Sequence, residues 1–80
     1  MSENLKQFKA KWRAHRGVLE LDAILIPFVE NKFNQLSESQ KDQFILLMDQ
    51  SDPVLQGWLI FGEELSLDHN FFDIINLIKK

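Results

Sequence analysis

The chain has 80 residues, no cysteine and a formal net charge of −3 at pH 7. Its length predicts one small domain, residues 1–80, with little room for a catalytic cleft enclosed by its own walls. The absence of cysteine excludes disulfides, thiolate nucleophiles and iron–sulfur ligation. Because the sequence also shows no secretory signal and no apolar segment long enough to cross a bilayer, we expect a soluble intracellular protein.

Residues 5–16 predict a first helix with two stripes. Leu5, Phe8 and Trp12 recur at helical spacing, and we interpret them as core residues. Four cations repeat this spacing one residue later, namely Lys6, Lys9, Arg13 and Arg16. Gly17 fits the position after a helix end, where a left-handed backbone costs glycine nothing.

A second helix, interrupted at a proline, is predicted next. Its apolar face combines Val18, Leu21, Ile24, Leu25, Phe28 and Val29. Glu20 and Asp22 lie in the first turn, where the helix dipole favours acids. Pro27 lacks an amide donor and clashes with the preceding turn, so we expect a kink or a break near Ile26.

Three further helices complete the predicted fold. Ser37 and Gln40 match a capping box, and the helix behind them ends near Gln50 with an apolar face of Phe44, Leu47 and Met48. Asp52 as a cap and Pro53 at the first helical position open a fourth helix. Its apolar residues are Leu55, Trp58 and Leu59, with Gly62 as the expected stop. The last helix takes its periodicity from Leu67, Phe71, Ile74, Ile75 and Ile78. Since no hairpin turn occurs, we predict an all-α fold, a small bundle of four to five short helices.

The side chains needed for catalysis do not come together in this sequence. His15 and His69 are far apart, and neither has a second ligand at helical spacing, so no metal site is predicted. The glycines Gly17, Gly57 and Gly62 do not form a phosphate-binding loop. We therefore expect no catalytic residue, and the protein is not expected to be an enzyme.

Arg16, Gly17 and Glu20 have two interpretations. As local structure they are a dipole cation, a helix cap and a first-turn acid, or Arg16 and Glu20 form an ion pair across the turn. As exposed residues, Arg16 and Glu20 would each contribute under about 1 kcal/mol to stability and could face a partner instead. Trp58 is equally ambiguous, because tryptophan occurs both in cores and at interfaces.

These residues lie within a longer resemblance. The runs WRAHRGVLELDAILIPF and LSESQKDQFILLMDQSDPVLQGWL are similar to the small flavinylation factors of succinate dehydrogenase, the FAD assembly factor family of bacteria and mitochondria. The similarity covers about residues 8–80. The family's Arg-Gly-x-x-Glu motif is matched by Arg16, Gly17 and Glu20, followed by Leu21 and Asp22. Its Asp-Pro and Trp-Leu signature is matched by Asp52, Pro53, Trp58 and Leu59. Ser51 departs from the pattern, because many members have a second acid there.

The resemblance implies an assembly factor. Such a factor binds the flavoprotein subunit of succinate dehydrogenase and promotes covalent attachment of FAD to a histidine of that subunit. The related flavoprotein subunit of fumarate reductase is a further partner that the resemblance suggests. On this basis we place partner binding at Arg16, Gly17, Glu20, Asp22 and Trp58. FAD would be attached to the partner and not held stably by this chain. We expect a monomer, and the lack of a presequence favours a cytoplasmic bacterial protein.

The charge distribution suggests a second class of function. Residues 1–16 contain five basic residues and one acid, whereas the remaining residues contain four basic and eleven acidic ones. A nucleic-acid-associated or toxin-neutralising regulator, an interpretation attached to some relatives, would act through this basic helix. The acidic remainder opposes phosphate attraction, so nucleic-acid binding is not expected.

Overall fold

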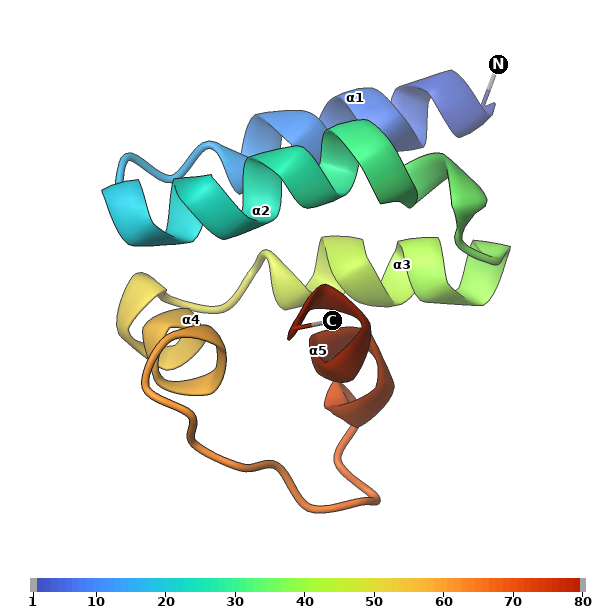
Figure 1. Cartoon of the computed structure of the whole chain (residues 1–80). Helices are drawn as coiled ribbons and strands as arrows, with labels where there is room; N and C mark the ends of the chain where they lie inside the picture. Colours follow the sequence, from blue (N-terminus) through green and yellow to red (C-terminus); the bar gives the residue numbers. More distant parts are fainter. Residues whose placement is uncertain (1, 80) are drawn as a thin grey trace.

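Five helices make up most of the described chain, residues 2–79, in the computed structural model (Figure 1). They are α1 (Ser2–Ala14), α2 (Leu19–Lys32), α3 (Glu38–Leu47), α4 (Asp52–Leu59) and α5 (Phe72–Lys79). A short 3-10 turn, η1 (Phe33–Gln35), follows α2. Residues 2–79 contain no strand, which confirms the predicted all-α class.

Among the first three helices, each runs antiparallel to the one before it (Figure 1). α1 packs on both α2 and α3, and α5 contacts α2, α3 and α4. α4 and α5 lie across the lower side of this layer and are joined by the longest loop, residues 60–71 (Figure 1). No helix in residues 2–79 is long and apolar enough to span a membrane.

The core lies where α2, α3 and α5 meet. Phe44 of α3 stacks on Phe28 with ring centroids 5.4 Å apart and meets Phe33 edge to face at 5.8 Å. The other large, fully buried side chains are Leu21, Leu25, Val29, Leu47, Leu55 and Ile74. The periodicity of the second and third predicted helices therefore identified core residues of α2 and α3 correctly. In the last predicted helix it did so for Ile74, Ile75 and Ile78.

The prediction for α1 is wrong about which side faces the core. Leu5, Phe8 and Trp12 are 70%, 70% and 74% exposed, whereas Ala10 and Ala14 are fully buried. Small side chains let the α1 backbone approach α2 and α3 closely, and the bulkier stripe lies on the opposite side of the helix. Periodicity alone could not decide between the two sides.

The predicted interruption of α2 does not occur as a break, since the helix is continuous through Pro27. Ala23 and Pro27 are both exposed. The carbonyl four residues before the proline, at Ala23, is therefore on the solvent side and can bond to water in place of the missing amide.

Two predicted helix starts are also corrected. The N-cap of α4 is Ser51, whose side chain makes no cap hydrogen bond, and Asp52 is the first helical residue. The last helix begins at Phe72, and Leu67 is 82% exposed in the preceding loop. The capping box at the start of α3 is confirmed, because Ser37 and Gln40 exchange both hydrogen bonds.

Candidate functional site

The connection between α1 and α2 is built around a glycine in the left-handed region. Gly17 has φ +79°, as the sequence predicted for a residue after a helix end. A side chain added at Gly17 would meet no atom within 4 Å, so the position demands a backbone conformation, not close packing. Any other residue would strain this turn, and Gly17 itself is exposed.

Arg16 ties this connection to the segment between α3 and α4. Its Nη1 donates to the Met48 carbonyl at 2.8 Å and its Nη2 donates to the Gln50 carbonyl at 2.8 Å. Its Nε donates to the Asp52 carboxylate, and the side chain is 15% exposed. The expectation of an exposed Arg16 is therefore wrong, and its ion-pair partner is Asp52 and not Glu20.

Asp22 fixes the same connection from the first turn of α2. Its two carboxylate oxygens accept hydrogen bonds from the backbone amides of Arg16 at 2.9 Å and Gly17 at 3.3 Å. Two amides of the loop between α1 and α2 thereby gain hydrogen-bond partners. Arg16 and Asp22 together hold the loop in one shape.

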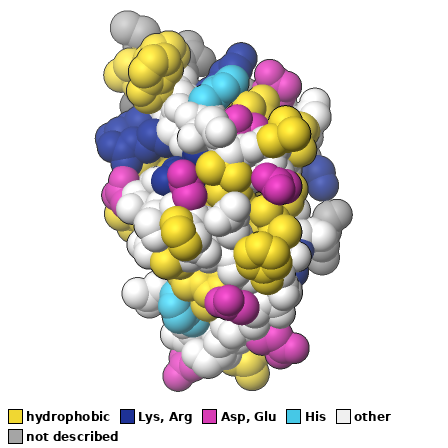
Figure 2. Space-filling view, turned by 90° about the vertical axis from the view of Figure 1, so that its left-hand side faces the viewer, with side chains coloured by type: hydrophobic (Ala, Val, Ile, Leu, Met, Phe, Trp, Pro, Cys, Tyr) yellow, Lys and Arg dark blue, Asp and Glu magenta, His cyan; other side chains and the backbone are white. Residues whose placement is uncertain are grey.

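Glu20 differs from these two residues, because its carboxylate is free. It lies exposed in the first turn of α2 and makes no ion pair or side-chain hydrogen bond with the described residues. Its neighbour Leu19 is 82% exposed. The loop therefore presents Gly17, Leu19 and Glu20 outward. At this end of the molecule, hydrophobic and acidic side chains alternate over the surface (Figure 2).

Trp58 is half-buried near the end of α4. Its ring lies 5.4 Å from the ring of His69 and 6.1 Å from that of Phe71, measured between centroids. Trp58 thus supports the loop between α4 and α5 with part of its surface and leaves the rest accessible.

Most cations of α1 and of the connection after it are already paired with acids of this chain. Lys6 lies 2.8 Å from Glu38 and 2.9 Å from Asp42, and Lys11 lies 3.7 Å from Glu30. Arg13 pairs with Asp49, and Arg16 pairs with Asp52. Within residues 5–79, whose side chains are described, Lys9 has no ion-pair partner. The basic stripe is therefore largely neutralised, which weakens the case for a phosphate-binding surface.

The contact between α1 and α3 predicts an acid-dependent loss of stability. Hydrogen bonding to Lys6 lowers the pKa of Glu38 below its usual 4.5. A carboxylate whose folded pKa is lowered stabilises the fold above its unfolded pKa, and this contribution is lost as the pH falls through the lowered value. We expect Glu38→Gln to melt below wild type at neutral pH and to approach wild type as the pH falls through the lowered pKa of Glu38. Thermal denaturation over a series of falling pH values checks this, with the exposed Glu64→Gln as control. A gap that stays the same across the series would contradict it.

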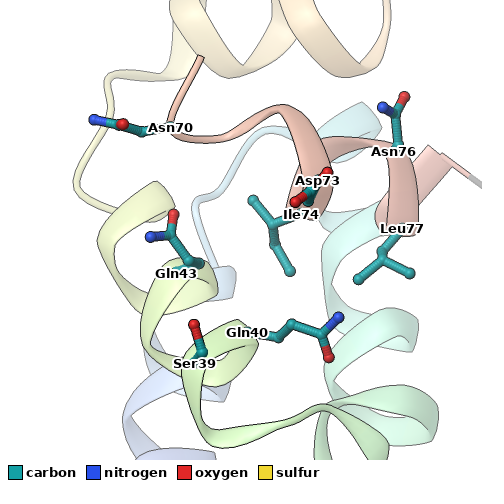
Figure 3. Close-up of a pocket in the computed structure, with 8 residues that line it drawn as sticks. All are labelled: Ser39, Gln40, Gln43, Asn70, Asp73, Ile74, Asn76 and Leu77. Carbon is teal, nitrogen blue, oxygen red and sulfur yellow. The ribbon is translucent and has the colours of Figure 1, made fainter. Parts of the chain in front are cut away.

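A hollow of about 410 Å³ lies between α3 and α5 (Figure 3). Its lining consists of Ser39, Gln40, Gln43, Asn70, Asp73, Ile74, Asn76 and Leu77. Gln40 and Gln43 of α3 border it on one side and residues of α5 on the other, and Asp73 is the sole titratable side chain in this lining. Such a lining offers neither a nucleophile with its base nor paired carboxylates. Across residues 5–79, whose side chains are described, no group of three His, Cys, Asp or Glu side chains gathers to hold a metal ion.

Comparison with known proteins supplies the context for this loop. A family model described as the flavinator of succinate dehydrogenase matches residues 8–80. The chain belongs to this family. A relative from Coxiella burnetii, named FAD assembly factor SdhE, is 45% identical over 80 residues, which cover 100% of this chain and 96% of the relative. Proteins of the same name from Pasteurella multocida and Legionella pneumophila (strain Lens) are 35% and 32% identical. These matches cover 92% and 96% of this chain and 87% and 95% of the relatives.

The two sequence motifs typical of the family contact each other in the structure. The two motifs that carried the resemblance, at Arg16–Gly17 and at Asp52–Pro53, are 36 residues apart in sequence and are joined by the Arg16–Asp52 pair. The sequence offered one signal for this contact, namely opposite charges in two separate motifs. Periodicity gives no information on which of several acidic side chains pairs with Arg16.

Proposed function

We propose that this protein is an assembly factor that binds the flavoprotein subunit of succinate dehydrogenase and promotes covalent attachment of FAD to it. Family membership and relatives named FAD assembly factor support the proposal. The structural observation behind it is the loop itself: Arg16 and Asp22 fix its shape, while Gly17 and Glu20 remain exposed. The flavoprotein of fumarate reductase is a second candidate partner. We place the protein in the bacterial cytoplasm, as a monomer.

The mechanism we propose is stabilisation of a reactive arrangement on the partner. A binding protein can favour one conformation only by binding it more tightly than the alternatives. The partner would supply the histidine and the flavin, and this chain would hold the surrounding segments so that the two meet in reactive geometry. The chain is therefore not the catalyst, and FAD is attached to the partner.

The four loop residues divide into two roles in this proposal. Arg16 and Asp22 are positioning residues, since their polar groups are engaged within the chain. Gly17 and Glu20 form the contact, because a backbone without a side chain allows close approach and a free carboxylate can accept charge-assisted hydrogen bonds. A loop already fixed in shape loses less entropy on binding. The accessible edge of Trp58 is a further contact.

Replacing Glu20 by alanine tests the contact separately from the fold. Because Glu20 is exposed and free of partners within the described chain, Glu20→Ala should change the free energy of unfolding by less than about 1 kcal/mol. Loss of a carboxylate paired across an interface should lower flavoprotein affinity by about tenfold or more.

The measurement is the fraction of flavoprotein carrying covalent FAD in cells that lack the wild-type factor. Glu64→Ala is the matched control, because Glu64 is an exposed acid in the loop between α4 and α5. We expect Glu64→Ala to restore flavinylation and Glu20→Ala to restore it poorly. Full restoration by a folded Glu20→Ala protein would remove Glu20 from the contact.

A regulator that binds nucleic acid remains the second candidate function, and it predicts a different dependence of affinity on salt and on the basic residues. Its affinity would fall steeply with salt and would depend on Lys6, Lys9 and Arg13 together. The pairing of Lys6 and Arg13 with acids of α3 and of the turn after it favours the flavoprotein partner.

A further inference from the structure

The large apolar side chains of α1 do not pack into the core of this protein. The α1 apolar stripe, formed by Leu5, Phe8 and Trp12, is at least 70% exposed at each position. On a helix with 3.6 residues per turn, these residues lie on the side opposite the buried Ala10 and Ala14. The stripe is therefore turned away from α2 and α3, the two helices on which α1 packs.

Exposure of this kind is unusual for such residues. A single exposed leucine or phenylalanine needs no explanation, but neighbouring large apolar side chains form a patch, and patches of this kind mark interaction sites. Hydrophobic side chains protrude beside basic ones at the top of the molecule, on the side of α1 (Figure 2). Tryptophan is among the residues that contribute most to binding at interfaces.

The borders of the stripe indicate the chemistry of its partner. Helical spacing places Lys9 along one border and Lys11 along the other. Lys9 has no ion-pair partner among residues 5–79, and Lys11 has a distant one, 3.7 Å from Glu30. An apolar patch with basic borders is complementary to an apolar surface with acidic borders.

The stripe is continuous with the loop proposed to contact the flavoprotein. A surface hollow beside Trp12 is lined by Lys9, Arg13 and His15 and extends to Arg16 and Asp52. Trp12 also borders two smaller hollows with His15. The apolar stripe therefore adjoins Arg16 in the loop between α1 and α2, and one partner could cover both.

We infer that the α1 apolar stripe is the hydrophobic anchor for the flavoprotein subunit, seated on an apolar surface with acidic borders. This inference rests on the proposed function. A second copy of this chain fits less well, because Lys9 and Lys11 of the two copies would be brought together. An anionic membrane also fits less well, since the chain carries a net charge of −3.

Binding measurements with the purified flavoprotein subunit test the inference. Phe8→Ser and Trp12→Ser should each lower the affinity by about tenfold or more while melting like wild type, because both side chains are exposed. Leu67→Ser is the matched control, since Leu67 is 82% exposed in a different part of the molecule and should bind as wild type does. Lys9→Glu should weaken binding and reduce its dependence on salt.

Three outcomes would overturn the inference in distinguishable ways. A wild-type protein that does not bind the flavoprotein overturns the proposed function and the anchor together. If Glu20→Ala weakens binding but Phe8→Ser and Trp12→Ser do not, the anchor is wrong and the function stands. If the two serine variants instead lose only self-association, or only binding to vesicles of phosphatidylcholine with phosphatidylglycerol, the stripe serves a second copy or a membrane.

Discussion

Replacing Phe44 by alanine is expected to lower the free energy of unfolding by about 3–5 kcal/mol. Phe44 is fully buried and its ring contacts those of Phe28 and Phe33, so truncation removes two aromatic contacts and leaves a cavity. A chain of 80 residues has a total stability of roughly 4–12 kcal/mol. The variant should therefore be marginally folded at physiological temperature.

Urea denaturation followed by circular dichroism measures this effect. Leu46→Ala on the same helix is the control, because Leu46 is 52% exposed and should cost less than about 1 kcal/mol. Equal midpoints for the two variants would show that the aromatic cluster is not the centre of the core.

Replacing Arg16 by alanine should cost about 2–4 kcal/mol of stability. The change removes a charged pair with Asp52 and leaves the carbonyls of Met48 and Gln50 without their donor. This expectation is larger than the sequence alone suggested, because the side chain is 15% exposed. Arg16→Lys keeps the charge but cannot reproduce the planar fork, so it should recover only part of the loss.

A double-mutant cycle with Asp52→Ala separates the pair from its surroundings. The coupling energy between Arg16 and Asp52 should exceed that between Arg13 and Asp49, whose side chains are 35% and 55% exposed. Chemical denaturation of the single and double variants gives both values. If the two cycles agree, Arg16 is an ordinary surface cation and its role in shaping the loop is wrong.

The sequence predicted those parts of the fold that depend on one dominant periodicity. In α2 and α3 the apolar face has no competitor, and Leu21, Leu25 and Phe44 are buried as expected. In α1 two stripes compete, and the small side chains of Ala10 and Ala14 take the core side. An alanine side chain buries too little apolar area to be recognised as a core residue from its pattern, although its small size allows the closest contact between helices.

The site was predicted at the level of the motif and not of its contacts. The left-handed Gly17 followed from helix-ending chemistry, whereas the sequence left open whether Glu20 pairs with Arg16 or faces a partner. The Arg16–Asp52 pair and the bonds from Asp22 to the loop amides depend on how α3 and α4 return to the end of α1. Such long-range placement is set by packing, which a single sequence does not encode in a local pattern.

The most direct test of the central claim is flavinylation with purified components. The flavoprotein subunit of succinate dehydrogenase, prepared without covalent flavin, is incubated with FAD in the presence or absence of this protein. Flavin fluorescence is then read on the denatured chains. Our account predicts that the wild-type protein raises the covalent FAD on the flavoprotein, that Glu20→Ala does so poorly, and that no flavin is attached to this chain. An equal yield of covalent FAD with and without the protein would contradict the account.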